Sequence, residues 1–142
     1  MKITLKNQFT PRIIFDKNKN FDVEKHAKSK MPLNVNFDIS VSYQKNPNLD
    51  TEYLVELRML WNDINSPVII DIICCGVFDV EGDFVDEELD GILKIEGAQA
   101  VFPFMRERIA NITLTGGITP VLMPPIDFKR IYEANKNKPT LQ

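Results

Sequence analysis

The sequence lacks the residues from which common metal and redox sites are built. Its 142 residues include one histidine and two cysteines. Cys74 and Cys75 are adjacent, so they cannot close a useful disulfide ring, and they lack the C-x-x-C spacing of redox and zinc sites. A lone histidine, His26 in a lysine-rich segment, cannot provide a common zinc site. We therefore expect a surface histidine, two half-buried cysteines on a strand, and neither a metal nor a cofactor.

The sequence motifs of common enzymes are also missing. It contains no G-x-S-x-G, no P-loop and no G-x-G-x-x-G. The acidic run at residues 79–90 resembles a calcium loop, but Phe84 stands where an EF-hand needs glycine and Asp90 where it needs glutamate. A solvated acidic turn and helix start explains this run better. The missing nucleophile and base predict a protein that is not an enzyme.

Targeting and membrane-spanning signals are absent as well. The first six residues contain no apolar stretch of the kind that a signal peptide needs. The longest apolar run, residues 72–78, is far shorter than the ~20 residues that cross a bilayer. These features favour a cytoplasmic protein with no direct membrane insertion.

Charge is present but segregated along the chain. The net charge is −3, whereas residues 1–30 carry +5, residues 31–105 carry −11 and residues 106–142 carry +3. An acidic middle disfavours a nucleic-acid-binding protein. The length and the 44% hydrophobic content predict one folded domain over residues 1–142.

Three segments have the apolar patterns of strands. Six apolar side chains in residues 33–43 alternate with polar ones, which defines one wet and one dry face. Residues 53–61 repeat the alternation, and residues 68–78 are nearly all apolar, as in a central strand covered on both faces. Short turns join these strands, which predicts an antiparallel meander. Residues 12–16 are expected to add a fourth strand, and residues 17–31 a surface crossover.

After residue 78 the apolar period becomes helical. Acidic residues 86–88 precede Leu89, as at the start of a short helix. Pro103 is predicted near the start of the next helix, which Gly116 and Gly117 end, and Asp127 is predicted to cap a terminal helix at residues 128–135. That middle helix carries an apolar stripe with spacings of three, four and three: Phe102, Met105, Ile109 and Ile112. The predicted fold class is therefore α+β, a four-stranded antiparallel sheet followed by helices on one face.

Apolar residues outside these patterns exceed what three short helices can cover. Among them are Phe9, Phe15 and Phe21, and the strap of residues 121–126. Contiguous exposed apolar surface usually marks interaction sites. The surplus favours oligomerisation or polypeptide binding over small-molecule chemistry.

The order of several motifs gives a resemblance to a known family. Gly76-Val77-Phe78 ends a strand, and Phe102-Pro103-Phe104-Met105-Arg106-Glu107 begins a helix. Gly116-Gly117, Pro120 and Pro124-Pro125-Ile126-Asp127-Phe128 follow, and then Tyr132. In this order and spacing they resemble the SecB protein-export chaperone family. The likeness covers roughly residues 9–135.

The resemblance implies a chaperone without ATP or catalysis that binds unfolded polypeptides in hydrophobic grooves. It also implies a homotetramer, a dimer of dimers, with the stripe Phe102, Met105, Ile109 and Ile112 at the interface between dimers. We expect the client groove to be formed by the strand residues and the strap that lids them: Phe15, Phe37, Ile39, Val41, Tyr43, Leu122 and Ile126.

Export in this family requires docking to SecA through an acidic and apolar patch, which the resemblance transfers to Asp16, Ile69 and Asp71. Arg12 stands where the family has a second acidic residue, and the Pro-Asn-Ala-Pro segment after the first strand is missing. Divergent SecB-like chaperones instead guard an antitoxin. Export, dedicated service to an antitoxin, and a non-chaperone interaction subunit therefore stay open, with an unfolded polypeptide and SecA as the expected partners.

Overall fold

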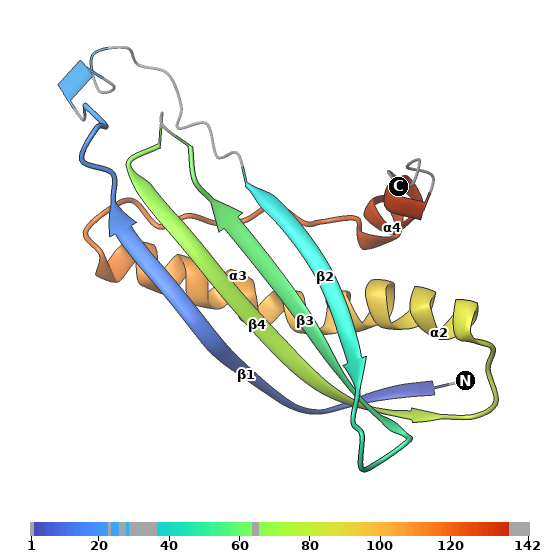
Figure 1. Ribbon diagram of the computed structural model, residues 1–142. Helices are drawn as coiled ribbons and strands as arrows, with labels where there is room; N and C mark the ends of the chain where they lie inside the picture. Colours follow the sequence, from blue (N-terminus) through green and yellow to red (C-terminus); the bar gives the residue numbers. More distant parts are fainter. Residues whose placement is uncertain (1, 23, 26–27, 29–36, 64–65, 137–142) are drawn as a thin grey trace.

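Four antiparallel strands form one sheet, and a long helical segment crosses one of its faces (Figure 1). The computed structural model describes residues 2–22, 24–25, 28, 37–63 and 66–136. The strands stand in the order β1-β4-β3-β2. Their bounds are β1 Lys2–Lys17, β2 Asp38–Lys45, β3 Glu52–Trp61 and β4 Val68–Glu81. The predicted α+β class and the meander with an added N-terminal strand are confirmed.

Strand β1 is much longer than the predicted residues 12–16. It pairs with β4 along its whole length, with two irregularities, one between Leu5 and Asn7 and one between Phe9 and Arg12. Each irregularity shifts the alternation of side chains between faces, as a β-bulge does, which hides the period of two in the sequence. Pro11 lies at the second irregularity of this edge strand, a position that tolerates a missing N–H.

Strands β3 and β4 begin within one residue of their predicted positions, whereas β2 begins five residues later than the predicted residue 33. On β3, alternate side chains from Tyr53 to Trp61 are buried on the helix side, as the sequence pattern predicts. Strand β4 is central, but within the described residues helices cover only one of its faces. Strand β2 begins at Asp38. Residues 33–36 lie outside the described residues, as does part of the predicted crossover, namely residues 23, 26–27 and 29–31, which include His26.

The helical segment is continuous from Asp86 to Thr115. Helix α2 (Asp86–Ile92) runs into a π-helical turn, η1 (Leu93–Gly97), and then into α3 (Ala98–Thr115). The prediction that Pro103 lies near a helix start is wrong, because Pro103 lies inside α3. The buried stripe starts earlier than the four residues in the sequence pattern, at Ala98 and Val101, and this extends the helix toward its N-terminus.

Two glycines end α3 as predicted. Gly117 has a φ of +83°, a left-handed conformation that favours glycine. The N–H of Ile118 donates to the carbonyl of Thr113 at 3.1 Å, and the N–H of Gly117 donates to that of Leu114 at 3.2 Å. These two bonds form a Schellman motif, which redirects the chain into the extended strap.

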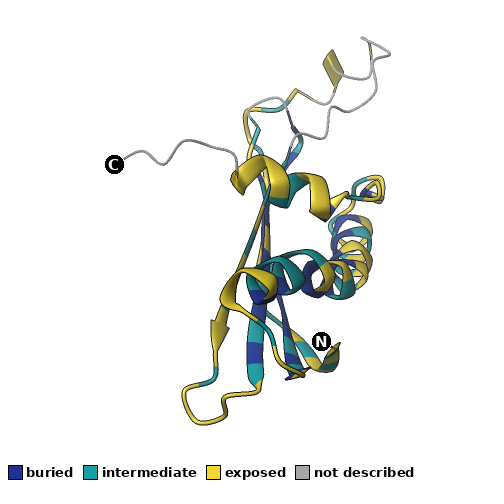
Figure 2. Cartoon of the chain, turned by 90° about the vertical axis from the view of Figure 1, so that its right-hand side faces the viewer, coloured by how far each residue is buried: buried dark blue, intermediate teal, exposed yellow. Residues whose placement is uncertain are grey.

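The strap returns the chain along the helical layer to α4 (Phe128–Lys136). Val121 and Met123 of the strap are buried, and the Val121 N–H donates to the Thr113 hydroxyl at 2.9 Å. Asp127 caps α4 as predicted, since its Oδ1 accepts from the N–H of Arg130 at 3.1 Å. Figure 2 shows that the buried residues lie between the sheet and the helices. Within the described ranges no helix combines the length and the hydropathy that a bilayer crossing requires.

Candidate functional site

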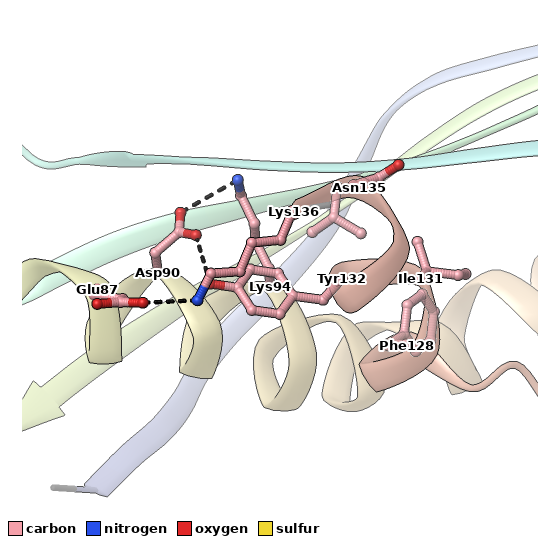
Figure 3. A pocket seen from close by; sticks show the side chains of 9 residues that line it. Glu87, Asp90, Lys94, Phe128, Ile131, Tyr132, Asn135 and Lys136 are labelled. Carbon is pink, nitrogen blue, oxygen red and sulfur yellow. Dashed lines mark hydrogen bonds and ion pairs between the residues drawn. The ribbon is translucent and has the colours of Figure 1, made fainter. Parts of the chain in front are cut away.

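A groove lies between the edge strand β2 and the helices (Figure 3). It encloses a cavity of about 270 Å³. Its walls come from one strand and three helical segments: Val41 of β2, Glu87 and Asp90 of α2, Lys94 of η1, and Phe128, Ile131, Tyr132, Asn135 and Lys136 of α4. The groove therefore combines apolar walls with a charged rim.

Strand β2 supplies an apolar wall and an unpaired backbone edge. Ile39, Val41 and Tyr43 alternate on the helix-facing side and are half-buried. The Tyr43 ring meets that of Tyr53 edge-on, with 6.1 Å between centroids. Among the described strands β2 pairs only with β3, so its second edge has free N–H and C=O groups. Such an edge can accept an additional strand.

Asp90 is the centre of the polar contacts in the groove. Its carboxylate accepts the Tyr132 hydroxyl at 3.0 Å and lies 3.2 Å from Lys94 Nζ. Burial would raise the pKa of Asp90, but the hydrogen bonds from Tyr132 and Lys94 outweigh it and lower the pKa. Burial and the nearby Asp90 raise the pKa of Tyr43 to about 12. Asp90 is therefore an anion and Tyr43 a neutral phenol near pH 7.

Helix α4 is anchored at its first residue. The Phe128 ring is buried and packs edge-on against Phe102 of α3, with 5.5 Å between centroids. Farther along α4, the Lys136 Nζ lies 2.6 Å from a carboxylate oxygen of Glu87. These contacts place the half-buried Ile131 and Tyr132 toward the groove.

Several predicted groove residues share this neighbourhood. Val41 lines the cavity, and Phe37, Ile39, Tyr43 and Ile126 are half-buried against the same core. Leu122 is 77% exposed, between the buried Val121 and Met123. Their contact with a client remains a prediction.

Phe15 does not belong to the groove. It lies on β1, at the opposite edge of the sheet from β2. Its ring packs on the end of α3, where a Cβ added at Gly116 would lie 2.3 Å from Phe15 Cζ. Phe15 therefore does not line the groove beside β2, because the sheet order separates the two strands, and its contact with a client remains a prediction.

The predicted interface stripe is also corrected. Phe102, Met105 and Ile109 are buried within the core of their own chain. Ile112 is half-buried on the same helix. The stripe covers the sheet of its own subunit, so Phe102, Met105 and Ile109 cannot contact a second dimer.

The sequence did not identify the charged residues of the groove as a functional site. Glu87 and Asp90 belong to an acidic helix start, and the same sequence pattern is found where such a helix start faces only solvent. Their lysine and tyrosine partners come from helical segments later in the chain. Only the path of the strap brings α4 back to α2.

The outer face of the sheet holds the predicted docking residues. Asp16 pairs in register with Ile69, and Asp71 lies two residues farther along β4. Asp71 is only 6% exposed and is bound by two arginines. Arg58 donates to both of its oxygens, at 3.0 and 2.8 Å, and Arg12 Nε donates to Oδ2 at 3.0 Å.

This network changes the chemistry expected at Asp71. The hydrogen bonds from Arg58, with a smaller effect from Arg12, lower the pKa of Asp71 despite its burial. Two guanidinium groups neutralise the single carboxylate. Asp71 is thus not a free acidic group on this face, contrary to the expectation for an acidic docking patch.

The two cysteines lie on β4 and point to opposite faces. Both are free and buried, Cys74 toward the helices and Cys75 toward the outer face. Burial raises the pKa of Cys75 to about 11. The expected placement of both cysteines on a strand is confirmed. Both side chains are almost fully buried, whereas half-buried side chains were expected.

The fold and the groove define an α+β protein with one helix-covered sheet face and a groove beside an edge strand. The family model described as SecB, preprotein translocase subunit SecB, matches residues 1–139. The chain therefore belongs to the SecB family, as its motifs indicate.

Curated relatives named protein-export protein SecB include the following two. The one from Bartonella quintana (strain Toulouse) is 33% identical over 72% of this chain and 70% of its own length. The one from the Wolbachia of Brugia malayi (strain TRS) is 38% identical over 56% of this chain. That match spans about half of the relative's length, 51%.

A solved structure shares the fold. It is the SecB-like chaperone Rv1957 of Mycobacterium tuberculosis in complex with a ChAD peptide from the HigA1 antitoxin. The TM-score is 0.71 at 15% identity, covering 87% of this chain and 90% of that chain. At this identity the likeness establishes the fold.

Proposed function

We propose that this protein is a cytoplasmic, ATP-independent chaperone that binds non-native polypeptides in the groove between β2 and α4. The observation that carries the proposal is an apolar-walled groove beside an unpaired strand edge, in a member of the SecB family. Val41 and Ile131 offer contacts that any apolar side chain can use. The protein needs no catalytic group for this activity.

An extended client segment would use the edge and the groove together. Backbone groups of β2 can pair with the client main chain, which gives affinity without sequence specificity. Because side chains of a strand alternate, every second client residue would point toward Ile39, Val41 and Tyr43. Binding the unfolded state then opposes folding and aggregation by mass action.

The outer face of the sheet supports a proposal about the class of client. The finer alternative to general export is dedicated service to one aggregation-prone client such as an antitoxin. The pairing of Asp71 with Arg12 and Arg58 favours this alternative, because it removes the free acid of the patch Asp16, Ile69 and Asp71. Titration with purified SecA decides between them, since micromolar binding that Asp71→Lys abolishes would favour export.

The assembly proposed is a homotetramer of ~65 kDa, four copies of 16.3 kDa. The exposed face of α3, which includes the 61% exposed Leu114, is available for contact between subunits. Light scattering coupled to gel filtration measures the mass. A stable monomer at micromolar concentration would contradict this assembly.

An aggregation assay tests the chaperone activity directly. A chemically unfolded client is diluted into buffer with and without this protein, and turbidity is followed without ATP. We expect suppression near one tetramer per client chain. No suppression at stoichiometric tetramer for any of a set of unrelated clients would refute the proposal.

A further inference from the structure

The charged side chains that line the groove form two ion pairs (Figure 3). Lys94 Nζ lies 3.2 Å from a carboxylate oxygen of Asp90, and Lys136 Nζ lies 2.6 Å from one of Glu87. The cavity lining thus holds two acids and two bases, each acid beside a base. Near pH 7 their charges sum to zero. The groove is therefore charge-balanced, although the helix start that supplies both acids is strongly acidic.

The two pairs lie at different depths. The Glu87 and Lys136 side chains are 74% and 53% exposed, whereas those of Asp90 and Lys94 are 31% and 36% exposed. Lys94 Nζ also lies over the ring of Tyr43 on β2, 5.9 Å from its centroid. Charges act more strongly where less water surrounds them. The Asp90–Lys94 pair is therefore the one whose balance a bound client side chain would sense.

The π-helical turn η1 gives Lys94 this position. Buried side chains follow one another at four residues from Leu89 to Leu93, but the next buried side chain is that of Ala98, five residues on. A step of five is the period of a π-turn, which adds one residue to the helix. In an uninterrupted α-helix Lys94, four residues before Ala98, would lie on the buried stripe. In η1 Leu93 occupies the core and Lys94 faces the groove.

We propose that Lys94, placed by η1, is a specificity-determining residue of the client groove: it cancels the charge of Asp90, so that the groove selects client segments by their apolar content and not by the sign of their charge. This inference rests on the proposed function, because it concerns the same client site. Apolar contacts with Val41 and Ile131 then supply the affinity. Basic and acidic residues that flank an apolar client segment are accepted alike.

A first experiment measures the charge preference of the groove. Two fluorescent peptides share one apolar core and are flanked by lysines or by glutamates, and anisotropy gives both affinities at about 0.15 M salt, which screens distant charges. We expect wild type to bind the two within about threefold of each other. Lys94→Met removes the ammonium and keeps an apolar stem, so the lysine peptide should bind about tenfold more tightly than the glutamate peptide. That preference should shrink at about 0.5 M salt.

Two matched variants separate the position of the cation from the total charge. Lys94→Arg keeps a cation in the groove and should bind both peptides as wild type does. Lys94→Ile/Ile95→Lys keeps the composition and net charge but moves the cation to a residue that lines a separate depression along α2 and η1 and not the groove. This exchange should show the same preference for the lysine peptide as Lys94→Met. An exchange variant without any preference would overturn the inference.

The outcomes separate this inference from the chaperone proposal. If wild type binds both peptides and Lys94→Met leaves the ratio of their affinities unchanged, the role of Lys94 is refuted and the proposed function stands. A wild-type preference of about tenfold for either peptide also refutes only the inference. If wild type binds neither the peptides nor an unfolded protein, the proposed function fails and the inference fails with it.

Discussion

The two faces of the sheet differ although the same strands form both. On the helix side, Ile70 and Ile72 of β4 are fully buried. Their neighbours Ile69 and Ile73, on the outer side of the same strand, are only half-buried. All four residues are isoleucines, so the difference in burial comes from α3 and the strap, which cover only one face of the sheet. Apolar content alone therefore does not identify the core face of a central strand.

On the outer face, charged side chains and not a helix cover the middle of the sheet. Asp71 stands opposite Leu60 and Ile14 in the middle of this face, and Arg12 and Arg58 cover it from both sides. Burying a carboxylate is favourable only when it is paired and hydrogen-bonded. The inner face thus depends on packing, and the outer face on one ion network.

Removing a side chain from the packed face is expected to have the largest effect. Met105 of α3 is fully buried against the sheet, so Met105→Ala should lower the free energy of unfolding by about 2–5 kcal/mol. Urea denaturation at fixed protein concentration measures the loss. Leu49→Ala, at an exposed position in the turn between β2 and β3, is the control and should stay within about 0.5 kcal/mol of wild type. Equal losses would mean that burial against the sheet does not decide the effect.

A charge introduced into the groove tests the functional side of the comparison. Val41→Asp places a carboxylate on the apolar wall beside Asp90, and we expect client affinity to fall roughly tenfold or more, since a buried valine contributes about 1.5–3 kcal/mol. Fluorescence anisotropy with an unfolded client measures the affinity. Ser42→Asp puts the same charge on the outer face of the same strand and should leave affinity unchanged. If both variants lose affinity alike, the client does not distinguish the faces.

The ion network of the outer face should give the smallest effect. Asp71→Asn leaves two guanidinium groups without their carboxylate, but these are 49% and 45% exposed, so water screens the loss to about 1 kcal/mol. Urea denaturation near pH 7 measures it. An unchanged stability would show that the network closes the face without stabilising it.

The stability difference between wild type and Asp71→Asn is expected to depend on pH. Arg58, and then Arg12, lower the pKa of Asp71 in the folded state. A lowered pKa stabilises the fold at pH values above the pKa of the unfolded chain, and the gain is lost as pH falls through the folded pKa. The stability difference between wild type and Asp71→Asn should therefore shrink in acid, below about pH 4. A difference that is constant down to pH 2 would contradict this origin.

Much of the fold could be predicted from local patterns. The alternation in β3, the glycines that end α3 and the Asp127 cap are all signals read within a few residues. The length of β1 could not be predicted, because its bulges break the period. The start of α3 was predicted too late because of Pro103, since proline is more common in the first turn of a helix than in its interior.

For the candidate site, too, only the features with a local sequence pattern could be predicted. The apolar wall of β2 is visible as alternation, so Val41 could be named from the sequence. The partners Glu87 and Lys136, which are 49 residues apart, could not, because no local pattern joins them. Three residues of the stripe on α3, Phe102, Met105 and Ile109, were placed at a subunit interface because an apolar residue looks the same in the sequence whether it faces a second subunit or its own core.

The sequence by itself determined the elements, the alternation of their faces and, through its ordered motifs, the SecB family. Only the tertiary structure decided which apolar residues are core, that Asp71 is neutralised, and that α4 lies against α2. The reason is physical. Periodicity and caps are local properties of the backbone, whereas burial and ion pairing depend on which distant segments the sheet order and the strap bring together.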